Sequence, residues 1–143
     1  MRILILNGPN LNLLGMREPG IYGTESYGDL CELIARHCAE RGIEHTVFQT
    51  NHEGVLVDTL QEAIGRYDGI VFNPAAYTHT SVAIADAVKA IRIPTVEVHI
   101  SDVSAREAFR QISYVRDACV ATVSGHGLHG YLEAIDLLAE RLG

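Results

Sequence analysis

The chain has 143 residues, a length that suits a single domain in which about two-thirds of the unfolded surface becomes buried. With 48% hydrophobic and 20% charged residues it has the composition of a folded globular protein, which excludes a disordered chain. The formal net charge of -7 argues against partners such as nucleic acid or an anionic membrane, and no apolar run reaches the roughly 18 residues of a membrane helix.

Apolar runs and helical patterns alternate along the chain. The run at 3–6 predicts a buried strand, and a helix is predicted from Ser26, which has capping-pair spacing with Asp29, to Gly42. Further strands are predicted at 43–49, 69–72, 94–100 and 119–123, and further helices at 56–65, 80–91 and 128–142. Five strands, each followed by a helical pattern, predict one α/β domain over residues 1–143, a doubly wound parallel sheet in three layers.

The carboxyl ends of the strands are where such sheets bind ligands. In the fourth predicted strand Glu97 and His99 are two residues apart, so both side chains point to the same face. A carboxylate beside an imidazole sets its tautomer and raises its basicity, which suits general acid or base catalysis, and Arg106 and Arg110 follow closely. The alternative is a solvated glutamate and an ordinary core histidine.

The loop after the first strand, residues 8–23, is long for a strand-to-helix connection and has the length of a lid. It carries Arg17 and Tyr22 among glycines that could act as hinges. A guanidinium beside a phenol favours the phenolate, so this pair could supply a base. A tyrosine that simply packs the loop is the alternative.

Two further patterns predict no cofactor or metal. The glycines at 125, 127 and 130 match a dinucleotide-binding spacing, but the chain lacks the later strand and acidic residue that this fold requires. A tight turn and close helix packing explain these glycines instead. His126 and His129 lack the companions of a metal site, and three cysteines without a C-x-x-C pair suggest reduced thiols in a cytoplasmic protein.

Six motifs occur in order along the chain. They are Asn7-Gly8-Pro9-Asn10-Leu11, Arg17-Glu18-Pro19 with Tyr22-Gly23, Asn73-Pro74 with Thr78-His79-Thr80-Ser81, Glu97-Val98-His99-Ile100-Ser101, Arg106-Glu107 with Phe109-Arg110, and the segment 125–131. Together they resemble the type II 3-dehydroquinate dehydratases over essentially the whole chain. The resemblance implies a cofactor-free, flavodoxin-like lyase of the shikimate pathway, a dodecamer of four trimers that converts 3-dehydroquinate to 3-dehydroshikimate.

The resemblance also implies a mechanism of anti elimination through an enolate. Tyr22, made phenolate by Arg17, would take the proton from C2 of the substrate. Asn10 would hold a water that stabilises the enolate, and His99, oriented by Glu97, would protonate the leaving C1 hydroxyl.

Substrate binding is implied in the same way. Backbone N–H groups of Ile100 and Ser101 would hold the carboxylate, and the hydroxyls would meet the side chains of Asn73, His79 and Arg110. Arg106 would act electrostatically or in lid closure, and Asp86 would reach the site of a neighbouring subunit. The helix around Asp86 is apolar nearly all round, which favours a subunit contact on its outer side.

This chain departs from the family pattern at a few positions. Alanines at 75 and 76 stand where a glycine is common, Ser104 replaces a frequent histidine, and Ala85 replaces a basic residue that often precedes Asp86. None of these changes removes a chemical group that the implied mechanism uses, but Ala85 leaves open how Asp86 is held.

Three alternatives remain beside the biosynthetic enzyme. The same reaction serves quinate breakdown, and a non-catalytic α/β module could bind a small molecule in the same place. A type I dehydratase is a Schiff-base enzyme on a TIM barrel. It is disfavoured because the only lysine, Lys89, lies late in a helix and the chain is shorter than the about 250 residues of a barrel.

Overall fold

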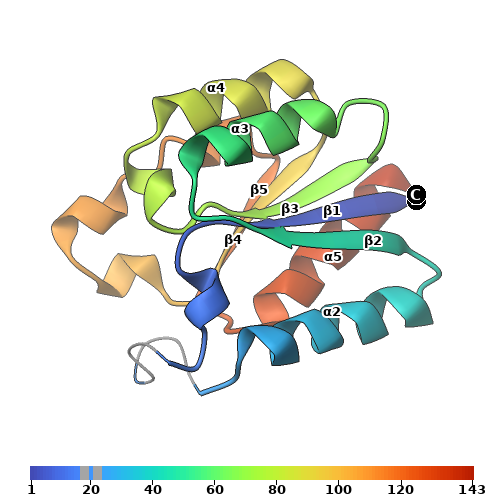
Figure 1. Ribbon diagram of the computed structural model, residues 1–143, viewed down its shortest axis with the longest axis horizontal. Helices are drawn as coiled ribbons and strands as arrows, with labels where there is room; N and C mark the ends of the chain where they lie inside the picture. Colours follow the sequence, from blue (N-terminus) through green and yellow to red (C-terminus); the bar gives the residue numbers. More distant parts are fainter. Residues whose placement is uncertain (17–19, 21–23) are drawn as a thin grey trace.

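The computed structural model describes residues 1–16, 20 and 24–143. Five parallel strands form one sheet in the order β2-β1-β3-β4-β5 (Figure 1). Their bounds are β1 (Arg2–Asn7), β2 (Glu44–Gln49), β3 (Gly69–Asn73), β4 (Thr95–His99) and β5 (Ala121–Ser124). The predicted doubly wound sheet is therefore confirmed, with this strand order typical of flavodoxin-like proteins.

Four α-helices cover the two faces of the sheet in the described chain (Figure 1). One face carries α2 (Tyr27–Glu40) and α5 (His129–Leu142), and the other carries α3 (Glu53–Glu62) and α4 (Val82–Ile91). Alternate residues of β1 enter opposite cores: Ile3 and Ile5 pack with α2 and α5, whereas Leu4 and Leu6 pack with α3 and α4. Burial on both faces explains why this strand is an unbroken apolar run.

Local signals in the sequence have the predicted effect. Ser26 and Asp29 form a reciprocal capping box at the start of α2, and Gly42 follows its end with φ of 66°. A Cβ at Gly130 would lie 3.3 Å from Val98 and 3.4 Å from Val123, so this glycine lets α5 pack closely on β4 and β5.

The connection from β4 to β5 differs from the expected helical pattern. It contains only short 3-10 helices, namely η3 (Val103–Ala105), η4 (Ala108–Gln111) and η5 (Arg116–Ala118). Within it Val103 and Val115 are buried, while Phe109 and Ile112 are exposed. The segment therefore has no continuous apolar stripe on which an α-helix could pack against the sheet.

The strand order changes direction between β1 and β3. From β1 the chain continues to β2 at one edge of the sheet, and from β3 it continues through β4 to β5 at the other edge. A crevice forms at the carboxyl ends of strands where such a reversal occurs.

Among the helices described, none has the length and apolar character needed to cross a membrane.

Candidate active site

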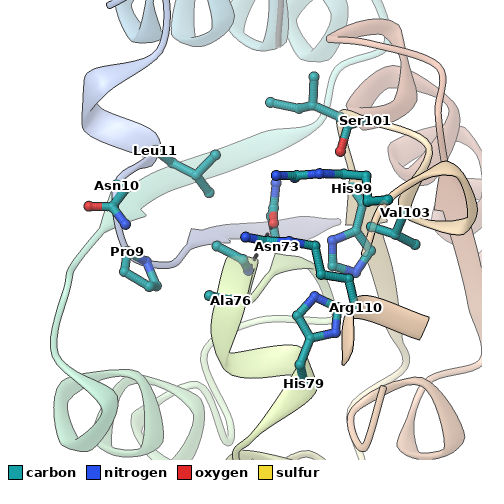
Figure 2. Close-up of a pocket in the computed structure, with 13 residues that line it drawn as sticks. Pro9, Asn10, Leu11, Asn73, Ala76, His79, His99, Ser101, Val103 and Arg110 are labelled. Carbon is teal, nitrogen blue, oxygen red and sulfur yellow. Dashed lines mark hydrogen bonds between the residues drawn. The ribbon is translucent and has the colours of Figure 1, made fainter. Parts of the chain in front are cut away.

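A cavity of about 200 Å³ lies at the carboxyl ends of β1, β3 and β4 (Figure 2). It is lined by Pro9, Asn10, Leu11, Asn73, Ala75, Ala76, His79, His99, Ile100, Ser101, Val103, Arg106 and Arg110. The lining combines two histidines and two arginines with amide groups, so it suits a small polar anion.

The loop after β1 forms one wall of the cavity. The Gly8 N–H donates to the Asn73 carbonyl at 2.8 Å, and a Cβ at Gly8 would lie 2.6 Å from the Pro74 carbonyl oxygen. Only glycine permits this approach of the two loops. Asn10 follows with φ of 70°, which asparagine tolerates, and its N–H donates to Asn51 Oδ1 at 3.0 Å.

Asn73, at the end of β3, lies in the centre of the view in Figure 2. Its Oδ1 accepts from the Ala75 N–H at 3.0 Å, and its Nδ2 donates to the Tyr131 hydroxyl at 2.9 Å. Ala75 has φ of 52°, a conformation that favours glycine and that aims its N–H at the amide oxygen.

His79 has a defined tautomer. Its Nδ1 lies 2.6 Å from the Ile112 carbonyl oxygen, which can only accept, so Nδ1 carries the hydrogen. Burial lowers the pKa of His79, the positive charges of His99 and Arg110 lower it further, and the hydrogen bond to Ile112 opposes them. The ring is therefore neutral near pH 7, and Nε2 can accept a hydrogen bond from a ligand.

Glu97 and His99 form a buried pair at the end of β4. The His99 Nε2 lies 2.9 Å from Glu97 Oε2; His99 is 5% exposed and Glu97 is 0% exposed. His99 lines the cavity, whereas Glu97 lies behind it. The contact leaves Nδ1 as the ring nitrogen of His99 that can meet a ligand. The predicted carboxylate–imidazole pair is thus observed in space.

Several further donors converge on Glu97. The hydroxyls of Thr78 and Ser113 donate to Oε2 at 2.5 and 3.0 Å, the Thr122 hydroxyl donates to Oε1 at 3.2 Å, and Arg116 Nε lies 3.6 Å from Oε1. Burial alone would raise the pKa of Glu97. The hydrogen bond and charge of His99, with the hydroxyls of Thr78 and Ser113, lower it to about 2. Glu97 is therefore a carboxylate at any pH at which the protein works.

The turn between β5 and α5 supports the backbone after β4. The Gly125 N–H donates to the His99 carbonyl at 3.3 Å, and the Gly127 N–H donates to the Ile100 carbonyl at 3.1 Å. Gly125 and Gly127 both have positive φ, at 82° and 61°. The glycine motif thus orients the segment that contains the Ile100 and Ser101 N–H groups.

The arginines come from the 3-10 segment between β4 and β5. Arg110 Nε donates to Glu107 Oε2 at 2.7 Å, and its guanidinium lies 5.0 Å from the centre of the Phe109 ring. Arg106 Nε is 4.0 Å from the same carboxylate. Glu107 therefore fixes the Arg110 guanidinium directly and lies near that of Arg106, and both arginines line the cavity.

Most residues predicted for the site come together in this cavity. Those that line it are Asn10, Asn73, His79, His99, Ile100, Ser101, Arg106 and Arg110, with Glu97 directly behind. Asp86 is exposed on α4 and is not among the residues that line this cavity. Arg17 and Tyr22 lie outside the described residues.

Other contributors were not identified from the sequence. Thr78, Ser113 and Thr122 hold Glu97, and Tyr131 holds Asn73. Hydroxyl residues at unrelated positions carry no spacing signal, although Thr78 does fall within one of the quoted motifs. Within the described parts of the chain, no group of three or more His, Cys, Asp or Glu side chains could hold a metal ion.

Comparison with known proteins agrees with this geometry. A family model described as "Dehydroquinase class II" matches residues 1–139. The 3-dehydroquinate dehydratase of Caldicellulosiruptor saccharolyticus is 50% identical over 143 residues, which cover 99% of each chain. That of Clostridium beijerinckii is 52% identical and covers 96% of this chain and 95% of its own. The crystal structure of type II dehydroquinase from Butyrivibrio crossotus superposes with a TM-score of 0.96 at 50% identity, over 97% of each chain.

Proposed function

The chain belongs to the class II dehydroquinase family, and from this premise we propose how its cavity dehydrates 3-dehydroquinate to 3-dehydroshikimate. The reaction removes a proton from C2, beside the ketone, and a hydroxyl from C1. The site must therefore take one proton, stabilise an enolate and deliver one proton to the leaving oxygen.

His99 is the acid in this proposal. When the ring is an imidazolium, Nε2–H donates to the Glu97 carboxylate and the proton on Nδ1 can pass to the C1 hydroxyl, which leaves as water. The buried Glu97–His99 pair is the observation that carries the proposal, because the contact with Glu97 at Nε2 leaves Nδ1 of His99 as the ring nitrogen that can meet the substrate in the cavity.

Tyr22 and Arg17 are assigned as base and activating cation because a guanidinium beside a phenol favours the phenolate and because the family resemblance implies these roles. The phenolate of Tyr22 would take the C2 proton, and Asn10 would hold a water that donates to the enolate oxygen. Asn10 lines the cavity opposite His99 in Figure 2, an arrangement that supports a site with acid and enolate-stabilising groups on different sides.

Binding of the substrate uses the remaining lining residues. The backbone N–H groups of Ile100 and Ser101 would hold the carboxylate, close to the positive charge of Arg106. The hydroxyls would meet the side chains of Asn73, His79 and Arg110. Arg106 and Arg110 line the cavity, and their positive charges would attract the anionic substrate.

The assembly is also part of the proposal. A dodecamer built of trimers would place Asp86 of one subunit at the site of its neighbour. The outer face of α4 supports such a contact, because Val82 is 54% exposed there and Ala83 and Asp86 lie beside it. The three cysteines are free thiols, which suits a cytoplasmic enzyme, and we assign the enzyme to aromatic biosynthesis rather than to quinate breakdown.

Turnover of 3-dehydroquinate tests the catalytic proposal against a non-catalytic binding module. The product has a C=C bond conjugated with its ketone, so its ultraviolet absorbance reports the rate. The parent should turn over at the same rate with and without EDTA, and His99→Ala should lower kcat by about 10²- to 10⁴-fold. His126→Ala is the matched control, since His126 is exposed, pairs with Glu133 and does not line the cavity.

A parent chain that binds the substrate without turnover would instead establish the binding module. If His99→Ala had the same kcat as His126→Ala, the assignment of His99 as the acid would be wrong, whereas the proposed dehydratase activity would stand.

A further inference from the structure

A chain of hydrogen bonds, buried except at its Tyr27 end, joins Asn73 of the cavity lining and Asn7 of the sheet to helices α2 and α5. Asn73 Nδ2 donates to the Tyr131 hydroxyl at 2.9 Å, and that hydroxyl donates to Asn7 Oδ1 at 2.7 Å. Asn7 Nδ2 continues to the Tyr27 hydroxyl at 3.3 Å. Tyr131 comes from α5, 58 residues beyond Asn73, so this contact depends on the packing of that helix.

The direction of each bond follows from the first donor. The Ala75 backbone N–H can only donate, so the atom it meets, 3.0 Å away, is the oxygen of Asn73. The other end of the amide is then the NH₂ group, which donates to Tyr131. The single hydroxyl hydrogen of Tyr131 must in turn point to Asn7 Oδ1.

Three of the four residues in this chain of hydrogen bonds are buried. Tyr131 and Asn7 are 0% exposed and Asn73 is 3% exposed, so no bulk water replaces a lost partner. Burial raises the pKa of Tyr131 far above the range in which proteins work, which keeps its hydroxyl neutral and able to accept and donate at once. A polar group left unpaired here would be costly.

We propose that Tyr131 is a positioning residue, which holds the amide of Asn73 so that its second N–H points into the cavity. Asn73 lines the cavity, and its second N–H takes part in neither of the two contacts described. Asn73 is then a hydrogen-bond donor to the ligand.

A hydrogen-bond acceptor lines the same cavity as the Asn73 donor. His79 presents Nε2 as an acceptor, because its Nδ1–H is bonded to the Ile112 carbonyl. A donor and an acceptor on the same cavity select hydroxyl groups, which accept from one and donate to the other, over ether oxygens, which only accept. This inference rests on the proposed function, since it takes the hydroxyls of the substrate as the groups bound here.

The test is a kinetic comparison of Tyr131→Phe with Tyr27→Phe. Each variant removes one phenolic oxygen from the same chain of bonds, but only Tyr131 contacts Asn73. Tyr131→Phe should raise KM about tenfold, the value of one hydrogen bond to the ligand, with kcat changed by less than about threefold. Tyr27→Phe should leave KM within about twofold of the parent. General loss of stability would lower the amount of active enzyme and leave KM unchanged.

A double variant shows whether Tyr131 acts through Asn73. If it does, Tyr131→Phe should add almost nothing to the KM of Asn73→Ala. Additive effects, an unchanged KM in Tyr131→Phe, or an equal rise in Tyr27→Phe would overturn the proposal. A parent without turnover would refute the proposed function instead. In that case a crystal structure of Tyr131→Phe still decides the positioning role: a rotated Asn73 amide supports it, and an unmoved one refutes it.

Discussion

Replacing Glu97 by glutamine removes one buried negative charge from behind the cavity while keeping the shape of the side chain. The carboxylate accepts from His99, Thr78, Ser113 and Thr122 and lies near Arg116, whereas an amide offers only one oxygen to these donors. Glutamine also resembles the protonated, neutral form of Glu97, so the pKa of this residue predicts the size of the effect.

The magnitude follows from proton linkage. The pKa of Glu97 is lowered in the folded protein from an ordinary 4.5 to about 2, which corresponds to about 3 kcal/mol of stability for the charged form. Because the folded-state pKa is the lower one, this stability is fully present above pH 4.5 and is lost as the pH falls toward 2. Glu97→Gln should therefore unfold with a free energy lower by about 3 kcal/mol at pH 7.

Urea denaturation at several pH values measures this difference. Parent and variant are compared at equal protein concentration, because an oligomer's stability depends on it. The gap between them should shrink as the pH falls below 4.5. Glu44→Gln is the control: Glu44 pairs with Arg2 at the surface, where such pairs contribute about 0 to 1 kcal/mol. A Glu97→Gln variant as stable as the parent at pH 7, or a gap independent of pH, would refute the reasoning.

Three further predictions concern the base, the subunit contact and the loop after β3. Tyr22→Phe should nearly abolish turnover while the substrate still binds, measured by kinetics and calorimetry; a near-normal kcat would show that Tyr22 is not the base. Asp86→Ala should lower activity and Asp86→Arg should also weaken the dodecamer in sedimentation experiments, and unchanged kinetics and assembly would count against a shared site. Ala75→Gly should raise the free energy of unfolding by about 0.5–1 kcal/mol, because relief of the left-handed strain exceeds the extra chain entropy of glycine. Lower stability in urea denaturation would mean that Ala75 is not strained.

The main elements and part of the site could be predicted because their signals are local. A strand buried on both faces is an apolar run, as β1 is, and Ser26 caps α2 through a residue three positions away. Glu97 and His99 could be paired for the same reason, since neighbours with a spacing of two share one face of a strand. The loop that carries Arg17 and Tyr22 suggested a base, but their specific roles depended on the family resemblance, and their placement stays a prediction.

The connection between β4 and β5 shows where local patterns were insufficient. A helical pattern was expected there, but the segment contacts residues of the site instead. The Ile112 carbonyl sets the tautomer of His79, and the Ser113 hydroxyl donates to Glu97. These contacts join the segment to residues distant in the sequence, so its own local pattern could not predict them.

The sequence by itself identified candidate residues for the chemistry and most of the order in which strands and helices follow one another, because both depend on residue type and short spacing. Only the tertiary structure decided how that chemistry is supported. Thr78, Ser113 and Thr122 reach Glu97 from separate elements, and Tyr131 reaches Asn73 from α5. In the sequence alone, Tyr131 looks the same as the apolar residues on the buried face of the last helix. Its hydroxyl meets an amide 58 residues away only after the helix packs on the sheet, and such long-range contacts leave no local pattern.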